Sequence, residues 1–336
     1  MLAPRADATP GLLPGALDTV DAPLSLQRLV LGGSGRLPLP GSGRTLERWK
    51  ALAAVGAVDL SVAKLFEGHT DALAILAELG AEAPPAHSVW GTWCAEPPDA
   101  RLMLHFDEHG TARLAGRKAW CSGAAQVTHA VVSCWNTANE PCLAAVVMQQ
   151  PGVTICQDAW QAVGMADTHT GDVLFDDVLA AQIGRPGNYV QRPGFWHGGA
   201  GIAACWFGGM LGIAEAVRRA SVPKADAYRQ AHLGAIDVAM SSAAAVLRDA
   251  AVWIDAQPDS DAQALALRAR LVVEHAAGEV MAHAGRALGA APFCRDAHFA
   301  RAMADLPVYL RQSHAERDLA ALGAIAANAG EELWML

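Results

Sequence analysis

The chain has 336 residues, 52% of them hydrophobic, and a formal net charge of −9 at pH 7. This length allows a large buried core with two or three structural units, and the apolar composition excludes a disordered chain. The acidic balance and the absence of a basic run argue against a nucleic-acid partner.

The seven cysteines are dispersed and show neither Cys-x-x-Cys nor a Cys/His zinc spacing, so we expect no metal site. An odd, scattered set is typical of reduced thiols, and the N-terminus lacks the pattern of a signal peptide. We therefore expect a cytoplasmic protein. The apolar stretch 198–214 is short for a membrane span and rich in glycine, which predicts a buried helix and no membrane partner.

Residues 1–44 are rich in proline and glycine, which predicts a loose leader with one short helix around 24–31. Residues 59–79 have a helical period on either side of Gly68, which predicts two helices joined at Glu67-Gly-His-Thr. His69 at this junction is either a capped or solvated side chain or part of a substrate pocket. Residues 1–85 thus form the expected leader and short helical N-terminal domain.

Residues 86–190 have a different character, with short runs rich in Trp, Val, Thr and Cys between turn signals. The runs are 87–95, 101–106, 113–114, 130–135, 143–148, 153–157 and 172–175. This pattern predicts a central antiparallel, barrel-like β domain over 86–190.

The stretch 114–134 within this domain holds the most informative pattern. If its backbone is extended, side chains from Trp120 through Cys121 to Ser122 alternate in direction. Small residues at 123–125 let another group approach the main chain, and the apolar run 130–132 predicts a buried strand. An ordinary hairpin with a core tryptophan also explains this spacing.

From residue 195 the chain is helical to its end. A Gly- and Ala-rich segment at 200–220 allows close packing, and long periodic segments follow at 228–256, 260–288 and 296–328. We expect a C-terminal helical bundle domain over 191–336. The predicted fold class is α+β, with a short N-terminal helical region, a central antiparallel β domain and a C-terminal four-helix bundle.

The pattern Leu-x-Gly-x-Lys-x-Trp-x-Ser-Gly-Ala at 114–124, followed by an apolar strand, resembles the flavin-facing strand of the acyl-CoA dehydrogenase family. Segments 93–97, 164–178 and 184–189 resemble that family's first flavin-binding segment, closing strand and exit into the helical domain. The resemblance implies FAD as cofactor, with an aromatic wall beside a flat ring. It implies cofactor contacts from Trp93, Cys94, Ala95, Trp120, Cys121 and Ser122.

Two segments qualify this resemblance. Glu96-Pro97 match the family's Thr-Glu-Pro-Gly, but its threonine is replaced by Ala95 and the following glycine- and serine-containing run is reduced to Pro98-Asp99. Residues 285–293 resemble the family's Leu-Gly-Gly turn, which touches the cofactor of a neighbouring subunit. That turn implies a homodimer or homotetramer with cofactor contacts from Arg286 and Gly289, although Arg286 could equally be a solvated helix residue.

The family's usual catalytic Glu is absent. One of its two usual positions falls on Ile202 and the other on the run Gln312-Ser313-His314. His314 is the candidate base, with Ser313 beside it, because its ordinary pKa lies near neutrality and a carboxylate such as Glu316 or Asp318 could orient it. Asp318 is four residues further on and would share a helix face with His314. A surface helix with charge pairs is the alternative.

Three functions stay open. The first is an FAD-dependent oxidoreductase that desaturates an acyl-CoA, a carrier-bound acyl group or a related small molecule with a non-standard base. The second is a flavin-dependent monooxygenase of the same fold, whose members use His and Ser near the flavin. The third is a degenerate member that catalyses nothing. The missing Glu and the short N-terminal region favour the second and third.

Overall fold

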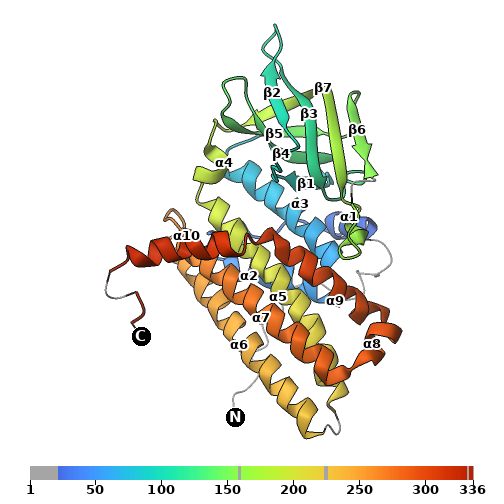
Figure 1. Ribbon diagram of the computed structural model, residues 1–336. Coiled ribbons are helices and arrows are strands. Elements are labelled where there is room, and N and C mark those ends of the chain that lie inside the picture. Colours follow the sequence, from blue (N-terminus) through green and yellow to red (C-terminus); the bar gives the residue numbers. More distant parts are fainter. Residues whose placement is uncertain (1–21, 158–159, 223–225, 331–332, 336) are drawn as a thin grey trace.

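The computed structural model describes residues 22–157, 160–222, 226–330 and 333–335 (Figure 1). Residues 1–21 of the leader predicted over 1–44 lie outside these residues. Figure 1 shows a β domain at one end, long helices at the other, and helix α3 between them. The predicted boundaries near 85 and 190 follow this arrangement but stay a prediction, because α2 and α3 also pack on α5 of the C-terminal region.

The N-terminal region consists of α1 (Ala22–Leu31), α2 (Thr45–Val58) and α3 (Leu60–Glu78). The predicted break at Gly68 is wrong, because α3 runs through it without interruption. Its N-terminus is capped by Asp59, whose carboxylate accepts the Val62 N–H at 2.9 Å. Gly68 is accommodated because β1 packs there, with Thr92 Oγ1 donating to the Gly68 carbonyl at 2.7 Å.

His69 occupies neither of its two expected environments. It is buried against the sheet, and its Nδ1 accepts the Trp90 N–H at 3.1 Å. Burial lowers the pKa of His69 to about 4, so the ring is neutral near pH 7. The side chain therefore joins α3 to β1.

The β domain contains the strands expected from the sequence. They are β1 (Trp90–Trp93), β2 (Leu102–Phe106), β3 (Ala112–Cys121), β4 (His129–Trp135), β5 (Pro141–Val147), β6 (Val153–Cys156) and β7 (Gly171–Ile183). Their order is β1-β4-β2-β3-β7-β5, with β6 on β7, and β5 also pairs with β4 to close a barrel-like ring.

The sheet is mixed, so the wholly antiparallel prediction is wrong. Both β1 and β2 run parallel to β4, while the other pairings are antiparallel. The β2–β3 hairpin separates β1 from β4 in the chain and supplies the long connection that a parallel pair needs.

The C-terminal region comprises α4 to α10. These helices are α4 (Asn188–Gln191), α5 (Gly194–Ala220), α6 (Ala227–Ala256), α7 (Gln263–Leu288), α8 (Ala290–Arg295), α9 (Ala297–Tyr309) and α10 (Glu316–Ala327). Helices α6, α7 and α9 pack around α5, α2 covers another side of α5, and α10 packs on α7. Among the described residues only α5 is long and apolar enough to cross a membrane, and 67% of its most apolar window is buried in the fold.

The predicted continuous helix over 296–328 is wrong. Helix α9 ends at Tyr309, a 3₁₀ turn covers 310–312, and α10 begins only at Glu316. Side chains compete for the backbone here: Asp318 accepts the His314 N–H at 3.0 Å, and Ser313 Oγ accepts the Ala315 N–H at 3.2 Å. Ala315 itself has a φ of 45°, outside the helical range.

Candidate functional site

A cavity of about 790 Å³ lies where α3, the ends of β1 and β3, and the α9–α10 junction meet. This volume falls in the range of small-molecule and cofactor pockets. Of the residues predicted to bind a cofactor or catalyse, those that line it are Trp93, Cys94, Ala95, Trp120, Ser122 and His314.

Trp120 presents a large aromatic surface to this cavity. Its backbone is left-handed, with a φ of 58°, and 55% of the residue is exposed. The extended backbone expected here is therefore wrong, because β3 shifts its register against β7 between Lys118 and Cys121. Such a bulge re-aims a side chain, and a strained non-glycine residue is typical of a functional site.

Cys121 follows Trp120 but points the other way. It is fully buried, its Sγ lies 3.3 Å from the Lys118 carbonyl, and burial raises the pKa of its thiol. The side chain does not line the cavity, so the predicted flavin contact from this thiol has no support in its placement.

Hydroxyl groups surround Ser122. Its Oγ lies 2.9 Å from Thr170 Oγ1, which in turn lies 2.7 Å from Thr168 Oγ1. Trp93 Nε1 donates to the Ser122 carbonyl at 3.1 Å and so fixes the end of β1 to the end of β3. This corner offers hydroxyl donors and acceptors beside the Trp120 ring.

A buried lysine anchors the segment that carries Cys94 and Ala95 to the sheet. Lys118 is 3% exposed, and its Nζ donates to Ser133 Oγ at 2.6 Å and to Glu96 Oε1 at 3.2 Å. Glu96 thus anchors the segment to the sheet. Burial raises the pKa of the Cys94 thiol, which keeps it protonated near neutral pH.

Helix α3 contributes charged residues that the sequence analysis missed. Lys64, Glu67 and Asp71 all line the cavity, and Lys64 Nζ lies 2.7 Å from Glu67 Oε2. Their spacing of i, i+3 and i+7 places them on one face of the helix. A charged stripe on an otherwise buried helix is the sequence signal that could have found them.

The α9–α10 junction brings His314 to the cavity. Its side chain is 56% exposed, and Nδ1 lies 3.5 Å from Asp318 Oδ1. The predicted carboxylate partner is therefore present, although His314 precedes the helix instead of sharing a helical face with Asp318. Ser313 is buried and does not line the cavity, because its Oγ accepts the Ala315 N–H.

One buried polar group at this junction lacks a partner. Gln312 Oε1 makes no hydrogen bond within the described part of the chain, whereas the buried Tyr309 hydroxyl pairs with the Cys205 thiol. Both residues line the cavity, as does Ile202, where one of the family's alternative bases would lie. Arg270 of α7 fixes the turn by donating to the Gln312 carbonyl at 2.7 Å and to the Gly199 carbonyl at 2.9 Å.

Arg286 and Gly289 lie elsewhere. Both are exposed at the C-terminal end of α7, and neither lines this cavity. The structure contains one chain, so their expected contact with a neighbouring subunit's cofactor stays a prediction.

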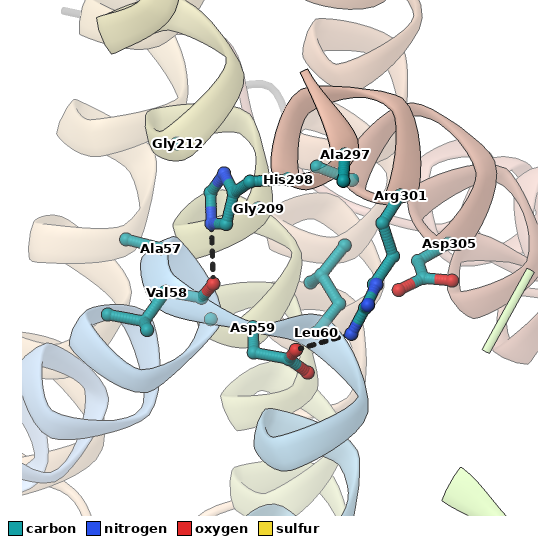
Figure 2. A pocket seen from close by; sticks show the side chains of 12 residues that line it. Ala57, Val58, Asp59, Leu60, Gly209, Gly212, Ala297, His298, Arg301 and Asp305 are labelled. Atoms are coloured by element: carbon teal, nitrogen blue, oxygen red, sulfur yellow. Dashed lines mark hydrogen bonds and ion pairs between the residues drawn. The ribbon is translucent and has the colours of Figure 1, made fainter. Parts of the chain in front are cut away.

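A second cavity of about 90 Å³ lies between α2, α5 and α9 (Figure 2). It is too small for a flavin but contains several ionisable side chains. Arg301 reaches toward Asp59 in Figure 2, with 3.6 Å between Nη1 and Oδ2, and also pairs with Asp167. Asp305 beside them accepts the Met165 N–H at 2.5 Å and so ties α9 to a loop of the large cavity.

No protein-family model matches the chain, and no curated protein matches its sequence. Solved structures do match. KijD3 in complex with FMN and a dTDP-amino-keto sugar aligns with a TM-score of 0.77 at 20% identity, over 90% of this chain and 86% of that one. TdsC from Paenibacillus sp. A11-2, a dibenzothiophene monooxygenase with FMN and indole bound, aligns with a TM-score of 0.74 at 18% identity, over 91% and 95%.

A third match is the methanesulfinate monooxygenase MsuC from Pseudomonas fluorescens. Its TM-score is 0.73 at 21% identity, over 91% of this chain and 88% of that one. The chain has the fold of these enzymes. The comparison therefore confirms the predicted combination of helices and a sheet, and the predicted three-part domain layout stays a prediction. Fold alone does not decide the reaction, which depends on the residues of the cavity.

Proposed function

We propose that the protein is a flavin-dependent monooxygenase that oxygenates a small molecule in the 790 Å³ cavity. The observation that carries this proposal is the α9–α10 junction. Gln312 and His314 line the cavity there, and Ile202 lines it at the other position where a dehydrogenase of this fold holds its Glu. The similar solved structures named as monooxygenases support the same reading.

The remaining carboxylates of the cavity do not replace that base well. Glu67 is already paired with Lys64, and Glu96 is bound by Lys118 and Ser133. Asp71 lies on α3, on another wall from the α9–α10 junction. Acyl desaturation therefore becomes the second candidate.

The residues of the cavity fit a flavin. Trp120 supplies a flat aromatic wall, Ser122 and Thr170 supply hydrogen-bonding hydroxyls, and the unpartnered Gln312 Oε1 accepts a donor. Arg317 near His314 suits a terminal phosphate, whereas Arg311 on the same wall already pairs with Glu274. Because KijD3 and TdsC hold FMN, we propose FMN in place of the FAD expected from the sequence.

A reduced flavin bound here would supply the electrons that activate molecular oxygen. The chain's own residues keep the α9–α10 junction in position and hold protons there. Asp318 faces His314 Nδ1 and leaves Nε2 free to hold or release a proton toward the cavity. Arg270 keeps the Gln312 carbonyl, and with it the start of this junction, in place.

The test begins with the visible absorption spectrum of the purified protein after addition of FMN or FAD. Retained flavin bands, consumption of oxygen with enzymatically reduced FMN, and no anaerobic bleaching by acyl-CoA thioesters would support the proposal. Bleaching by an acyl-CoA would instead support a dehydrogenase, and the absence of flavin binding would contradict both.

The His314→Asn variant then tests the role of the junction. We expect a loss of oxygenation of about a hundredfold, since general acid–base groups contribute on that order, with flavin binding unchanged. The matched control is His275→Asn, which alters an exposed histidine of α7 that does not line the cavity. Equal activity in both variants would exclude His314 from the reaction.

A further inference from the structure

The charged side chains that α3 and the end of β1 present to the 790 Å³ cavity are compensated by neighbouring charges. Lys64 Nζ lies 2.7 Å from Glu67 Oε2, and Lys118 Nζ lies 3.2 Å from Glu96 Oε1. Neither pair leaves a free charge for a ligand. These parts of the wall are therefore polar but close to neutral.

The other charges of the cavity wall are balanced or solvated. The buried Arg48 guanidinium behind α3 has Asp71 as its strongest opposite charge. Arg311 Nη2 lies 2.5 Å from Glu274 Oε1, and Arg317 is exposed, where water solvates its charge. A charged ligand buried here would lose its hydration without gaining a free counter-charge, which favours an uncharged ligand.

The aromatic side chains of the cavity have their polar atoms bound within the protein. Trp93 and Trp160 each donate Nε1–H to a backbone carbonyl, at 3.1 and 3.3 Å. The hydroxyls of Tyr189 and Tyr309 pair with buried or half-buried thiols. All four residues line the cavity, and they therefore offer ring surface to a ligand in place of hydrogen bonds.

Trp160, Met165 and Val308 lie together on one side of the cavity, which we call the α9 wall. Gly164, which accepts the Trp160 Nε1–H, packs so closely on α9 that a Cβ there would lie 2.8 Å from Val308 Cγ2. Met165 is 3% exposed, and its N–H is bound by Asp305 of the same helix. An indole and a thioether side by side suit an aromatic ring, because sulfur–aromatic and ring–ring contacts are both favourable.

The α9 wall adjoins the hydroxyl corner proposed for the flavin. Thr168 Oγ1 donates to the Met165 carbonyl at 2.7 Å and lies 2.7 Å from Thr170 Oγ1. Thr170 Oγ1 in turn lies 2.9 Å from Ser122 Oγ. A ring packed on the α9 wall would therefore lie beside a flavin bound at that corner.

We propose that the substrate is an uncharged aromatic compound whose ring packs against the α9 wall, with Trp160 as the residue that selects for aromaticity. This inference rests on the proposed function in taking the cavity as the place where flavin and substrate meet. A charged analogue would be buried without a counter-charge, and a saturated analogue would lose the contacts with the indole ring and the thioether.

The test uses four probes of one two-ring skeleton: 2-naphthol, decahydro-2-naphthol, 2-naphthoate and 2-naphthylmethylamine. Isothermal titration calorimetry at pH 7 measures their affinities for the full chain, both flavin-free and loaded with FMN. We expect 2-naphthol to bind about three- to tenfold more tightly than its saturated counterpart, and at least about tenfold more tightly than either charged probe.

The Trp160→Leu variant keeps the wall apolar and removes its ring, so the preference for 2-naphthol over decahydro-2-naphthol should fall to about twofold or less, with FMN affinity unchanged. Trp160→Phe should retain the preference. The matched control is Trp253→Leu, which alters a half-buried tryptophan of α6 that does not line the cavity. Thermal unfolding shows whether each variant remains folded.

Several results would overturn the inference. They are equal affinity of the natural protein for 2-naphthol and its saturated counterpart, tightest binding of a charged probe, and an unchanged aromatic preference in Trp160→Leu. Displacement of 2-naphthol by FMN, or a loss of FMN affinity in Trp160→Leu, would assign the α9 wall to the flavin. Failure of the proposed function is distinguishable, since absence of FMN binding and oxygen consumption leaves the Trp160-dependent preference measurable in the flavin-free protein.

Discussion

Trp120 combines two properties that rarely occur together in one residue. It is a bulky side chain in a left-handed backbone conformation, and it exposes its ring to the large cavity. Such a conformation is unfavourable for any residue with a Cβ, and glycine would adopt it without strain. The tryptophan therefore lowers stability locally, which is understandable if its ring binds a ligand.

The Trp120→Gly variant separates these two effects. We expect the affinity for FMN to fall about tenfold or more, because a stacked aromatic wall is lost. The flavin-free protein should unfold at an unchanged or higher temperature, because glycine relieves the strained φ of 58°. Fluorescence titration with FMN and thermal unfolding measure the two quantities. A lower unfolding temperature with unchanged FMN affinity would mean that Trp120 only stabilises the fold. That outcome would match the alternative of an ordinary hairpin with a core tryptophan.

Among the elements, α2 and α5 approach each other unusually closely. A Cβ on Gly208 of α5 would lie 2.2 Å from the Ala53 carbonyl oxygen of α2, whereas a Cβ on Gly199 of the same helix would meet nothing within 4 Å. We expect Gly208→Ala to lower the free energy of unfolding by about 1–3 kcal/mol through overpacking. Gly199→Ala should raise it by up to about 1 kcal/mol, because alanine favours the helix.

Urea unfolding of both variants tests this contact, with Gly199→Ala as the matched control. Equal stability of the two variants would show that α2 can move away from α5 without cost. The larger effect at Gly208 would show that the N-terminal region and the helical bundle share one core.

The elements differ in how well the sequence predicts them. All strands were found because turn signals such as Asp107-Glu-His-Gly bound short runs of β-forming residues. Helix α2 was missed, and the break expected at Gly68 does not exist, because packing against β1 outweighs the helix-weakening effect of a glycine. The opposite error occurred at 313–315, where hydrogen bonds from Asp318 and Ser313 end a periodic pattern that otherwise continues.

The candidate site was predictable only where a contiguous motif carries it. Trp93, Trp120 and Ser122 lie in strand segments with recognisable spacing, and the structure brings them together. Asp71 and Tyr309 lie on separate helices, and only tertiary packing shows that both face one cavity. The buried position of Cys121 agrees with the alternation of side chains along 120–122, whereas the left-handed backbone of Trp120 depends on a bulge that spacing does not reveal.

For the whole molecule, the expected homodimer or homotetramer is still to be measured. Arg286 is exposed and does not line the cavity of its own chain, so within a monomer its removal should not affect flavin binding. If a neighbouring subunit's flavin contacts it, Arg286→Ala should weaken FMN binding several-fold, since a charge-assisted hydrogen bond to phosphate is lost. Arg268→Ala, at another exposed position of α7, is the control. Light scattering gives the oligomeric state, and a monomer with unchanged FMN affinity in Arg286→Ala would contradict the prediction.

The second cavity joins distant parts of the molecule through ionisable groups. Asp59 caps α3, Arg301 of α9 pairs with Asp167, and Asp305 of α9 accepts the Met165 N–H beside the large cavity. Figure 2 shows Asp59, Arg301 and Asp305 around the small cavity. Burial raises the pKa of Asp305 to about 6 from an ordinary 3.8, against the opposing effect of the Met165 N–H. Burial also raises the pKa of Asp59. Both shifts therefore favour the protonated carboxyl in the folded protein.

The folded state binds the Asp305 proton more tightly than the unfolded state, so this stabilisation is fully present below about pH 4 and is lost as the pH rises through 6. Asp305→Asn removes the charge, and its amide oxygen still accepts the Met165 N–H. We expect the variant to exceed the natural protein in free energy of unfolding by about 1–3 kcal/mol at pH 7.5, with the difference vanishing near pH 4.

Urea unfolding across this pH range measures that difference, and Asp249→Asn on the exposed side of α6 should show none of it. A variant that is less stable than the natural protein at pH 7.5 would mean that the ionised carboxylate holds α9 to the Met165 loop better than a neutral amide. In that case Arg301 compensates the charge of Asp305 across the small cavity, and burial is no longer the dominant influence on that carboxylate.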